Sequence, residues 1–472
     1  MPRAFPASIL AALLVMEAFA AAPSAEIQSP WLSKLGPILQ LRLTQFLGRS
    51  RIVVGATNSA SVAPLTALVR LSGGRIVRTL PIINALEVDV PNLAIGTIAS
   101  SALVQHMSVD RVTVGSLERT GATIGATAVR NDLGYDGSGI GVAVIDSGVG
   151  PWLDDLGDAG GGMRIGRFVD FVGGRESAYD DYGHGTHVAG IIAGNGFDSN
   201  GARSGVAPAA HLVVLKVLDA SGGGHIGDVI AAIDYAVAHK DELNIRVINL
   251  SVAAAVDESY TIDPLTLAAQ RAVSAGIVVV AAAGNNGRGP QGRTQYGGIT
   301  APGNAPWVLT VGASSHMGTV DRSDDTIAAF SSRGPDAIDH AAKPDLVAPG
   351  VGIESLSTPA STLYSTMSPY LLPGTASTSY LPYLSLSGTS MATPVVAGTV
   401  ALMLQANPAL RPNEVKAILQ FTAQKYSGYD TLTQGAGFLN AKGAVDLARY
   451  VASPSTLPYP ATTDWSSHIV WG

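Results

Sequence analysis

A serine that immediately precedes a predicted helix is the first residue in this sequence that could do chemistry. Ser390 lies in the segment GTSMATP, residues 388–394, which a long apolar run follows. Pro394 fits the first turn of a helix, so the N–H of Ser390 is expected to point outward from a helix N-terminus, where negative charge is favoured. No acidic or basic neighbour activates the hydroxyl. Ser390 is therefore either an ordinary N-cap or a nucleophile that distant parts of the chain activate.

A nucleophilic serine needs a base, a group that orients the base, and donors for a developing oxyanion. Asp146 ends the strand-like run IGVAVID, where a buried carboxylate can hold an imidazole in one tautomer. His184 opens a helix-like segment and is the candidate base. Asn285 ends IVVVAAAGN, and its amide N–H groups could meet an oxyanion. Taken singly, Asp146 could instead cap a helix or join an ion pair, and Asn285 could be a turn residue.

A metal site is the alternative role for the histidine. His187 lies one helical turn after His184. Zinc-protease helices of the H-E-x-x-H type need a spacing of four and a glutamate, and neither is present here. The spacing therefore argues against zinc and favours His184 as a base.

Apolar runs alternate with helix-like segments from Gly139 onward, and this pattern predicts the sheet that must position these residues. The runs are IGVAVID, HLVVLKVLD, VINLS, IVVVAAAGN and WVLTVGA. They predict an α/β fold with a mostly parallel central sheet and helices on both faces. In such sheets ligands bind at the carboxyl ends of the strands, which here are Asp146, residues 249–251 and Asn285.

The candidates and their flanking residues, in chain order, resemble the subtilisin-like serine proteases, or subtilases. The matching segments are AVIDSG, GHGTHVAG, AAAGN and GTSMATP, and the resemblance covers roughly residues 120–452. It implies that Ser390 is the nucleophile, that His184 takes its proton and later gives it to the leaving amine, and that Asp146 orients His184. It also implies that Asn285 and the N–H of Ser390 form the oxyanion hole. The fold, and not the neighbouring sequence, would then activate the serine.

The resemblance further implies a substrate-binding edge that pairs with an extended peptide by strand addition. The implied substrate-binding residues are Ser251, Val252 and Ala253 along this edge, with Ala283 and Gly284 in the opposite wall. Ala253 and Ala254 stand where the family usually has glycines. Two extra methyl groups are expected to narrow the primary specificity pocket or its entrance.

The chemistry requires no cofactor, and the resemblance allows a structural calcium ion. Where the family often has a His-Pro-Asp-Leu stretch, this chain has GPWLDDL, so the family's calcium ligands cannot be placed. The acidic candidates for a hard cation are Asp154, Asp155, Asp180 and Asp198. Solvated carboxylates in glycine-rich loops are the alternative, so no metal ligand is assigned.

The N-terminus indicates a location. Residues 1–25 contain Arg3, a short apolar run and small residues of the A-x-A kind, which predict a secretory signal peptide and a secreted or extracytoplasmic protein. An amphipathic helix of a pro-region is the alternative. After this stretch a linker is expected at 26–50 and a small α+β inhibitory pro-domain at 51–116.

The remaining chain is expected to form a peptidase domain at 117–452 and an extended tail at 453–472. Residues 355–383 are uncharged and rich in Ser, Thr, Pro and Tyr, which predicts a long loop or hairpin inserted in the peptidase domain. This insertion ends seven residues before Ser390 and is therefore expected at the rim of the cleft.

The bulk composition narrows the range of partners. The chain has 472 residues, a net charge of -7 and only 14% charged residues, which argues against a nucleic-acid or polybasic membrane surface. It has no cysteine, which excludes disulfides, a thiolate nucleophile and a zinc-thiolate site. No segment beyond the N-terminal stretch is expected to span a membrane in the mature form.

These observations predict a secreted serine endopeptidase that works through an acyl-enzyme intermediate and is made as a self-processing precursor. The expected partners are polypeptide substrates and its own pro-domain, which acts as an intramolecular inhibitor. Two alternatives share the fold: a catalytically silent binding protein, and an acyl transferase that uses the same triad. A fluorophosphonate probe would separate the first alternative from an enzyme, and product analysis would separate the second.

Overall fold

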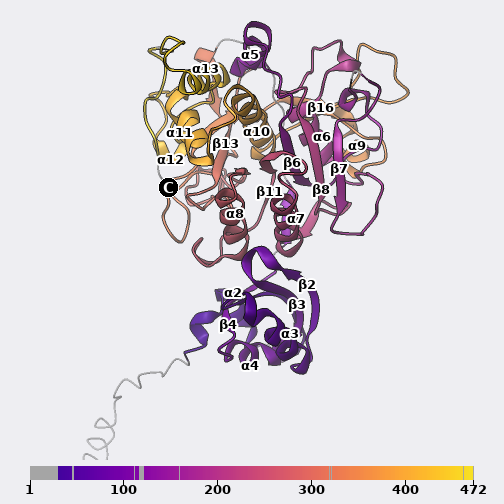
Figure 1. Ribbon diagram of the computed structural model, residues 1–472, viewed down its shortest axis with the longest axis vertical. Helices are drawn as coiled ribbons and strands as arrows, with labels where there is room; N and C mark the ends of the chain where they lie inside the picture. The colour runs from indigo at the N-terminus through magenta and orange to yellow at the C-terminus, as the bar shows by residue number, and fades with distance from the viewer. Residues whose placement is uncertain are drawn as a thin grey trace, which may run out of the picture.

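The central sheet expected from residue 139 onward lies in the middle of the larger part of the molecule (Figure 1). The computed structural model describes residues 30–44, 47–110, 112–115, 122–158, 160–317, 319, 322–460 and 462–470. The predicted signal peptide lies outside the described residues.

Seven strands of this sheet follow the order β14-β13-β12-β10-β6-β8-β7, and β15 pairs with β13. The strands are β6 (Gly141–Asp146), β7 (Ile165–Asp170), β8 (His211–Lys216), β10 (Ile245–Leu250), β12 (Val278–Ala282), β13 (Leu309–Ser315), β14 (Thr326–Ile327) and β15 (Leu346–Pro349). All pairs are parallel except β13 with β14. Every residue of β6 and β12 is buried, which explains the unbroken apolar runs. The predicted α/β fold with a mostly parallel sheet is confirmed.

Helices cover both faces of the sheet. Successive residues of a strand point to opposite sides, so both faces carry apolar side chains that the helices bury. Val142 and Val144 of β6 pack in one core, and Ala143 and Ile145 pack in the other. The first core receives side chains from α5 (Ala126–Leu133), α6 (His184–Ala193), α10 (Thr389–Ala406), α11 (Pro412–Thr422) and α13 (Ala441–Ala452). The second receives them from α7 (Ile226–Ala238) and α8 (Pro264–Ser274). A short helix, α12 (Thr431–Gln434), lies between α11 and α13 in the chain.

Helix α10 corrects one expectation from the sequence. With 18 residues and a mean hydropathy of 1.3, it is long and apolar enough to cross a membrane. However, 89% of it is buried inside the molecule, where it packs against α6, α13 and the sheet. Its apolar composition therefore matches a central core helix, which touches protein on nearly every side.

A smaller body at the N-terminal end has its own antiparallel sheet, in the order β2-β3-β1-β4. Its elements are β1 (Arg49–Ala56), α3 (Val62–Leu71), β2 (Arg75–Leu80), β3 (Ala85–Pro91), α4 (Ile95–Ala99) and β4 (Val104–Val109). Strand β2 and the turn Pro81–Ile83 pack against α7 and α8, as Figure 1 shows. We call residues 30–110 the N-terminal body.

The linker expected at 26–50 is in part folded. A short helix, α2 (Pro37–Arg42), follows a single 3-10 turn. Leu35 and Leu39 are buried, and they pack with Met107 of β4 in the core of the N-terminal body. The apolar side chains of this segment therefore complete a small core, which a solvated linker would leave exposed.

The insertion and the tail are also packed on the body. Within and around residues 355–383 lie α9 (Thr362–Thr366) and a three-stranded antiparallel sheet of β16 (Ile353–Leu356), β18 (Tyr383–Leu386) and β17 (Leu371–Leu372). In the tail, Trp465 is only 8% exposed and pairs with Gln424. The tail is docked on the body through this tryptophan.

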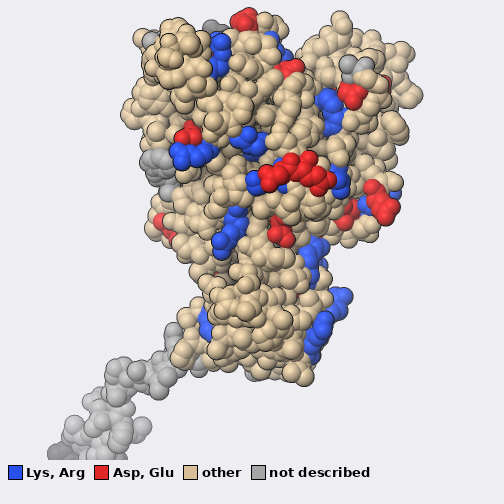
Figure 2. All heavy atoms as spheres, in the orientation of Figure 1, with Lys and Arg blue, Asp and Glu red and all other residues tan. Residues whose placement is uncertain are grey.

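The charged residues are sparse and mixed in sign on the face shown in Figure 2. Uncharged residues dominate this face, and it carries no continuous basic stripe. This agrees with the low charged fraction of the sequence.

Candidate active site

The pair Asp146 and His184 is formed where β6 ends and α6 begins. The Nδ1 atom of His184 lies 2.7 Å from Oδ1 of Asp146, and the N–H of Ser147 donates to the same oxygen at 2.7 Å. Both side chains are fully buried. A Cβ atom at Gly185 would collide with the carbonyl of Gly148, so glycine lets α6 approach the end of β6. The carboxylate can therefore hold the imidazole in one orientation with Nε2 directed elsewhere.

Ser390 lies in the first turn of α10, which packs against α6. Its Oγ donates to the carbonyl of Ser251 at 2.9 Å, and the Ser251 Oγ donates to the carbonyl of Ser390 at 2.7 Å. The side-chain amide of Asn249 donates to that same Ser251 hydroxyl at 2.9 Å. This reciprocal pair joins the end of β10 to the start of α10, and β10 is the neighbour of β6 in the sheet. Ser390 is thus held on the side of the sheet from which α6 presents His184.

Asn285 is tied to the residue directly before Ser390. Its Oδ1 accepts hydrogen bonds from the N–H of Thr389 at 3.0 Å and from the Thr389 hydroxyl at 3.1 Å. These two bonds orient the carboxamide, so its Nδ2 donors are on the side away from Thr389. Gly284 has a φ of +99°, and a Cβ there would collide with Thr300. The turn after β12 therefore needs glycine to bring Asn285 to the start of α10.

A short strand between the N-terminal body and the peptidase domain pairs with the segment that follows Ser251. Strand β5 (Val112–Gly115) lies between β11 (Val252–Ala253) and β9 (Gly223–His225), antiparallel to both. Gly115 pairs with Val252, the residue after Ser251, and Thr113 pairs with Gly224. An extended peptide is therefore bound by strand addition on two sides, with its carboxyl end directed toward Ser390.

The expected substrate-binding residues fall in two places. Val252 and Ala253 pair with β5, and Ser251 directly precedes them in the chain. Ala283 is fully buried, and its N–H donates to the carbonyl of Val311 at 2.9 Å. Ala283 therefore lies in the interior and not on the edge that pairs with β5. The second edge, β9, was missed, although the run of glycines at 222–224 after β8 was the available signal.

Asp180 is not placed as a cation ligand. Its Oδ1 accepts from the Ser147 hydroxyl at 2.9 Å and the N–H of Gly183 at 2.6 Å. Its Oδ2 accepts from the N–H of Thr186 at 2.8 Å and from the Thr186 hydroxyl at 2.6 Å. With the N–H of Tyr182, which donates to Oδ1 at 3.2 Å, the carboxylate has five donors around it and holds the loop that leads into His184.

Asp155 and Asp198 do come together. The N–H of Asp198 donates to Asp155 at 3.1 Å, and the Tyr383 hydroxyl donates to Asp155 at 3.0 Å. Burial, together with the charge of Asp155, raises the pKa of Asp198 to about 6. Among the described residues no group of three or more His, Asp or Glu side chains could hold a metal ion. A structural calcium ion stays an untested possibility, and no metal ligand is assigned.

The His187 ring does not contribute to a metal site either. Its Nε2 lies 2.9 Å from the carbonyl oxygen of Leu384 in β18, and the residue is fully buried. The imidazole therefore joins α6 to the small sheet of the insertion. This is a structural role, in place of the two-histidine site considered from the spacing.

Comparisons with known proteins identify the family of the chain. A family model described as "Subtilase family" matches residues 137–443. The chain is 37% identical over 370 residues to the serine protease AprX of Bacillus subtilis (strain 168), covering 77% of this chain and 79% of the relative. It is 32% identical over 376 residues to subtilisin E of the same strain, covering 79% and 83%.

A solved structure is similar in fold. Fervidolysin from Fervidobacterium pennivorans, described as a keratinolytic enzyme related to subtilisin, aligns with a TM-score of 0.63 at 23% identity. The alignment covers 84% of this chain and 61% of the fervidolysin chain.

Proposed function

The chain belongs to the subtilase family and is a serine endopeptidase, and we propose that Asp146, His184 and Ser390 are its catalytic triad. The observation that carries this proposal is the buried 2.7 Å contact between His184 and Asp146 beside helix α10, whose first turn carries Ser390. The polar groups around Ser390 support it, because they hold the nucleophile at a helix N-terminus.

In the proposed reaction, the Oγ of Ser390 attacks a peptide carbonyl while Nε2 of His184 takes the hydroxyl proton. Asp146 keeps Nδ1 of His184 protonated and stabilises the imidazolium. The oxyanion accepts hydrogen bonds from the Ser390 N–H and the Asn285 amide. His184 then gives its proton to the leaving amine, and the acyl-enzyme forms. Water, deprotonated by His184, releases the second product and restores Ser390.

A fluorophosphonate probe tests the proposal. It should label the parent protein, once the N-terminal body is removed, at Ser390 and at no other serine. The labelling rate should rise with pH as His184 loses its proton, because only neutral imidazole accepts the Ser390 proton. Mass spectrometry locates the label, and quenching the labelling reaction at successive times gives its rate. Absence of label, or a rate that is flat from pH 5 to 8, would refute the triad.

Replacing Asn285 by alanine tests the oxyanion hole. We expect kcat to fall by about 100 to 1000-fold with little change in KM, the range measured for the corresponding donor in subtilisin, a relative of this chain. The adjacent Asn286 is the control, because its side chain donates to the carbonyl of Gly298 at 3.3 Å and not to the start of α10. Asn286→Ala should keep kcat within a few-fold of the parent. Equal losses in the two variants would mean that the turn, and not the Asn285 amide, matters.

We also propose that substrates are extended polypeptides that replace β5 between β9 and β11. The pairing of β5 supports this, since it satisfies backbone groups on both neighbouring strands. Ala253 carries a methyl group on the paired edge, so we propose a preference for small or slender side chains in the primary pocket. Cleavage of a peptide library by the purified enzyme reports this preference directly.

We further propose that the N-terminal body is an inhibitory pro-domain that the enzyme removes itself, within residues 105–120. Strand β5 follows β4 closely in the chain and ends at Gly115, next to the Val252 edge. The same chain thereby delivers its own peptide to the cleft at a very high effective concentration. Partly buried ion pairs support tight association, such as Arg78 with Asp228 at 2.5 Å across the two bodies. The apolar stretch at 1–25 supports secretion of this precursor.

A further inference from the structure

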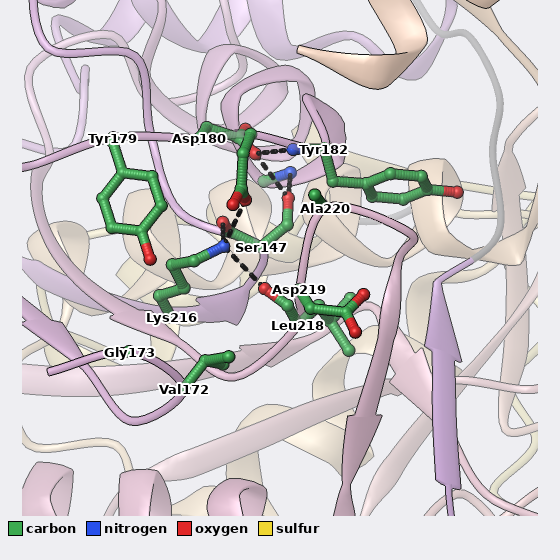
Figure 3. A network of polar contacts seen from close by, with 12 residues as sticks. Ser147, Val172, Gly173, Tyr179, Asp180, Tyr182, Lys216, Leu218, Asp219 and Ala220 are labelled. Carbon is green, nitrogen blue, oxygen red and sulfur yellow. Dashed lines mark hydrogen bonds and ion pairs between the residues drawn. The ribbon is translucent and has the colours of Figure 1, made fainter.

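Lys216 is a buried lysine that the reaction scheme does not use. It ends β8, where it pairs in register with Asp146 of β6, and it has no exposed surface. Its Nζ donates to the carbonyl of Ser147 at 2.7 Å, to Oδ1 of Asp181 at 2.7 Å and to the carbonyl of Leu218 at 2.6 Å, as Figure 3 shows in part. All three N–H donors of the ammonium are thus used. The Tyr179 ring covers a further side, 4.7 Å from Nζ.

The three acceptors belong to three different segments, and each segment carries part of the site. Ser147 directly follows Asp146. Asp181 lies in the loop that ends at Gly183, immediately before His184. Leu218 opens the segment that leads into β9, the second edge of the cleft. One ammonium group therefore ties together the chain segments that carry the carboxylate, the imidazole and a substrate edge.

The surroundings of Asp181 differ from those of the other acceptors. Its side chain is 37% exposed, whereas the two carbonyls are in the buried interior. The adjacent carboxylate, Asp180, is already saturated by donors from Ser147, Gly183 and Thr186. Lys216 therefore adds a positive charge to a region that holds the negative carboxylates of Asp180 and Asp181. A neutral side chain of the same length would fill the space but would neither hold the carbonyls nor balance these charges.

We propose that Lys216 is a positioning residue for the Asp146–His184 pair, which it holds through Ser147 and Asp181 while its charge sets the electrostatic field at the imidazole. This inference rests on the proposed function. The proposed role of Lys216 differs from that of a merely structural ion pair, which would stabilise the fold without changing the chemistry. Lys343 forms a merely structural ion pair of this kind. It is fully buried, and its Nζ donates to the carbonyl of Val308 and to Asp345, each at 2.9 Å.

The test compares Lys216→Met, Asp181→Asn and the control Lys343→Met in the mature enzyme with a small chromogenic peptide. For Lys216→Met we expect kcat to fall by about 10 to 100-fold, more than KM rises, because small misplacements of catalytic groups have effects of this size. The midpoint of the pH–kcat profile should rise by about half a unit or more, because a lost cation favours the protonated imidazole.

For Asp181→Asn the midpoint should move the opposite way, downward, since an anion is lost while Lys216 remains. Lys343→Met should lower the thermal unfolding midpoint but leave kcat within about two-fold and the pH midpoint unmoved. The inference is overturned if Lys216→Met keeps the parent's kcat and pH midpoint, or if Lys343→Met changes both as strongly. If Lys216→Met does not fold, the partly exposed Asp181→Asn decides by the direction of its midpoint.

Fluorophosphonate labelling of the parent distinguishes a failure of the Lys216 inference from a failure of the triad proposal. A parent that is not labelled at Ser390 refutes the proposed function before any variant is compared. A parent that is labelled, with variants that match it in rate and pH midpoint, refutes only the role of Lys216.

Discussion

Replacing Ser390 by alanine should abolish proteolysis and leave the N-terminal body attached. The variant lacks the only hydroxyl that the proposed reaction uses, and the loss of this nucleophile lowers kcat of subtilisin, a relative of this chain, by about 10⁶-fold. Since β5 lies between β9 and β11 within reach of the same site, processing should stop as well. On a denaturing gel the variant should run as a precursor, while the parent should be shorter by about 90 residues, given cuts near 25 and 116.

The control is Thr399→Ala in the same helix. Its hydroxyl is buried and donates to the carbonyl of Val395 at 2.9 Å, so the change removes a polar group of α10 without touching the cleft. This variant should mature and cleave peptides like the parent. Both proteins should be made in a host that lacks other secreted proteases. If Ser390→Ala is trimmed at the same junction there, an outside enzyme performs the processing.

Replacing Asp146 by asparagine should lower kcat by about 10⁴-fold, the effect of the same change in other proteases with this triad. Oδ1 of Asp146 accepts from both His184 and the N–H of Ser147. An amide has one acceptor oxygen and no charge, so it favours the wrong tautomer of His184 and does not stabilise the imidazolium. Turnover of a peptide substrate at the pH optimum measures the loss, and the folded fraction is checked by thermal unfolding.

Asp155→Asn is the matched control for this second prediction. Asp155 is also buried, and burial raises its pKa, but its partners are Tyr383 and Asp198 and not the imidazole. This variant should keep kcat within several-fold of the parent. A loss below about 100-fold for Asp146→Asn would mean that His184 does not depend on the carboxylate.

Some features could be predicted from the sequence because they are local. Inner strands of the central sheet such as β6 and β12 are buried on both faces, so each is a continuous apolar run that can be recognised without its neighbours. Asp146 ends such a run and Asn285 follows one, while His184 and Ser390 lie in the first turns of helices. The family resemblance lies in these short segments, and the order of the candidates along the chain was sufficient to propose their roles.

Other features depended on contacts between residues far apart in the chain. The position of β5 between β9 and β11 depends on pairing between residues more than 100 positions apart in the chain. No local pattern in Val112–Gly115 distinguishes this segment from an ordinary strand. The packing of Leu35 and Leu39 into the N-terminal body has the same origin. Pairing and docking follow from register and shape, which the hydrophobic pattern of a single segment does not contain.

The sequence by itself determined which residues could be nucleophile, base, orienter and oxyanion donor, because residue type and flanking pattern carry that chemistry. Only the tertiary structure decided that Asp180 holds a loop, that α10 is a core helix, and that Lys216 reaches Ser147, Asp181 and Leu218. A carboxylate or a lysine has the same composition in solvent, in an ion pair or beside a catalytic group. Its role is set by the donors and acceptors that folding brings within about 3 Å, and these come from separate segments of the chain.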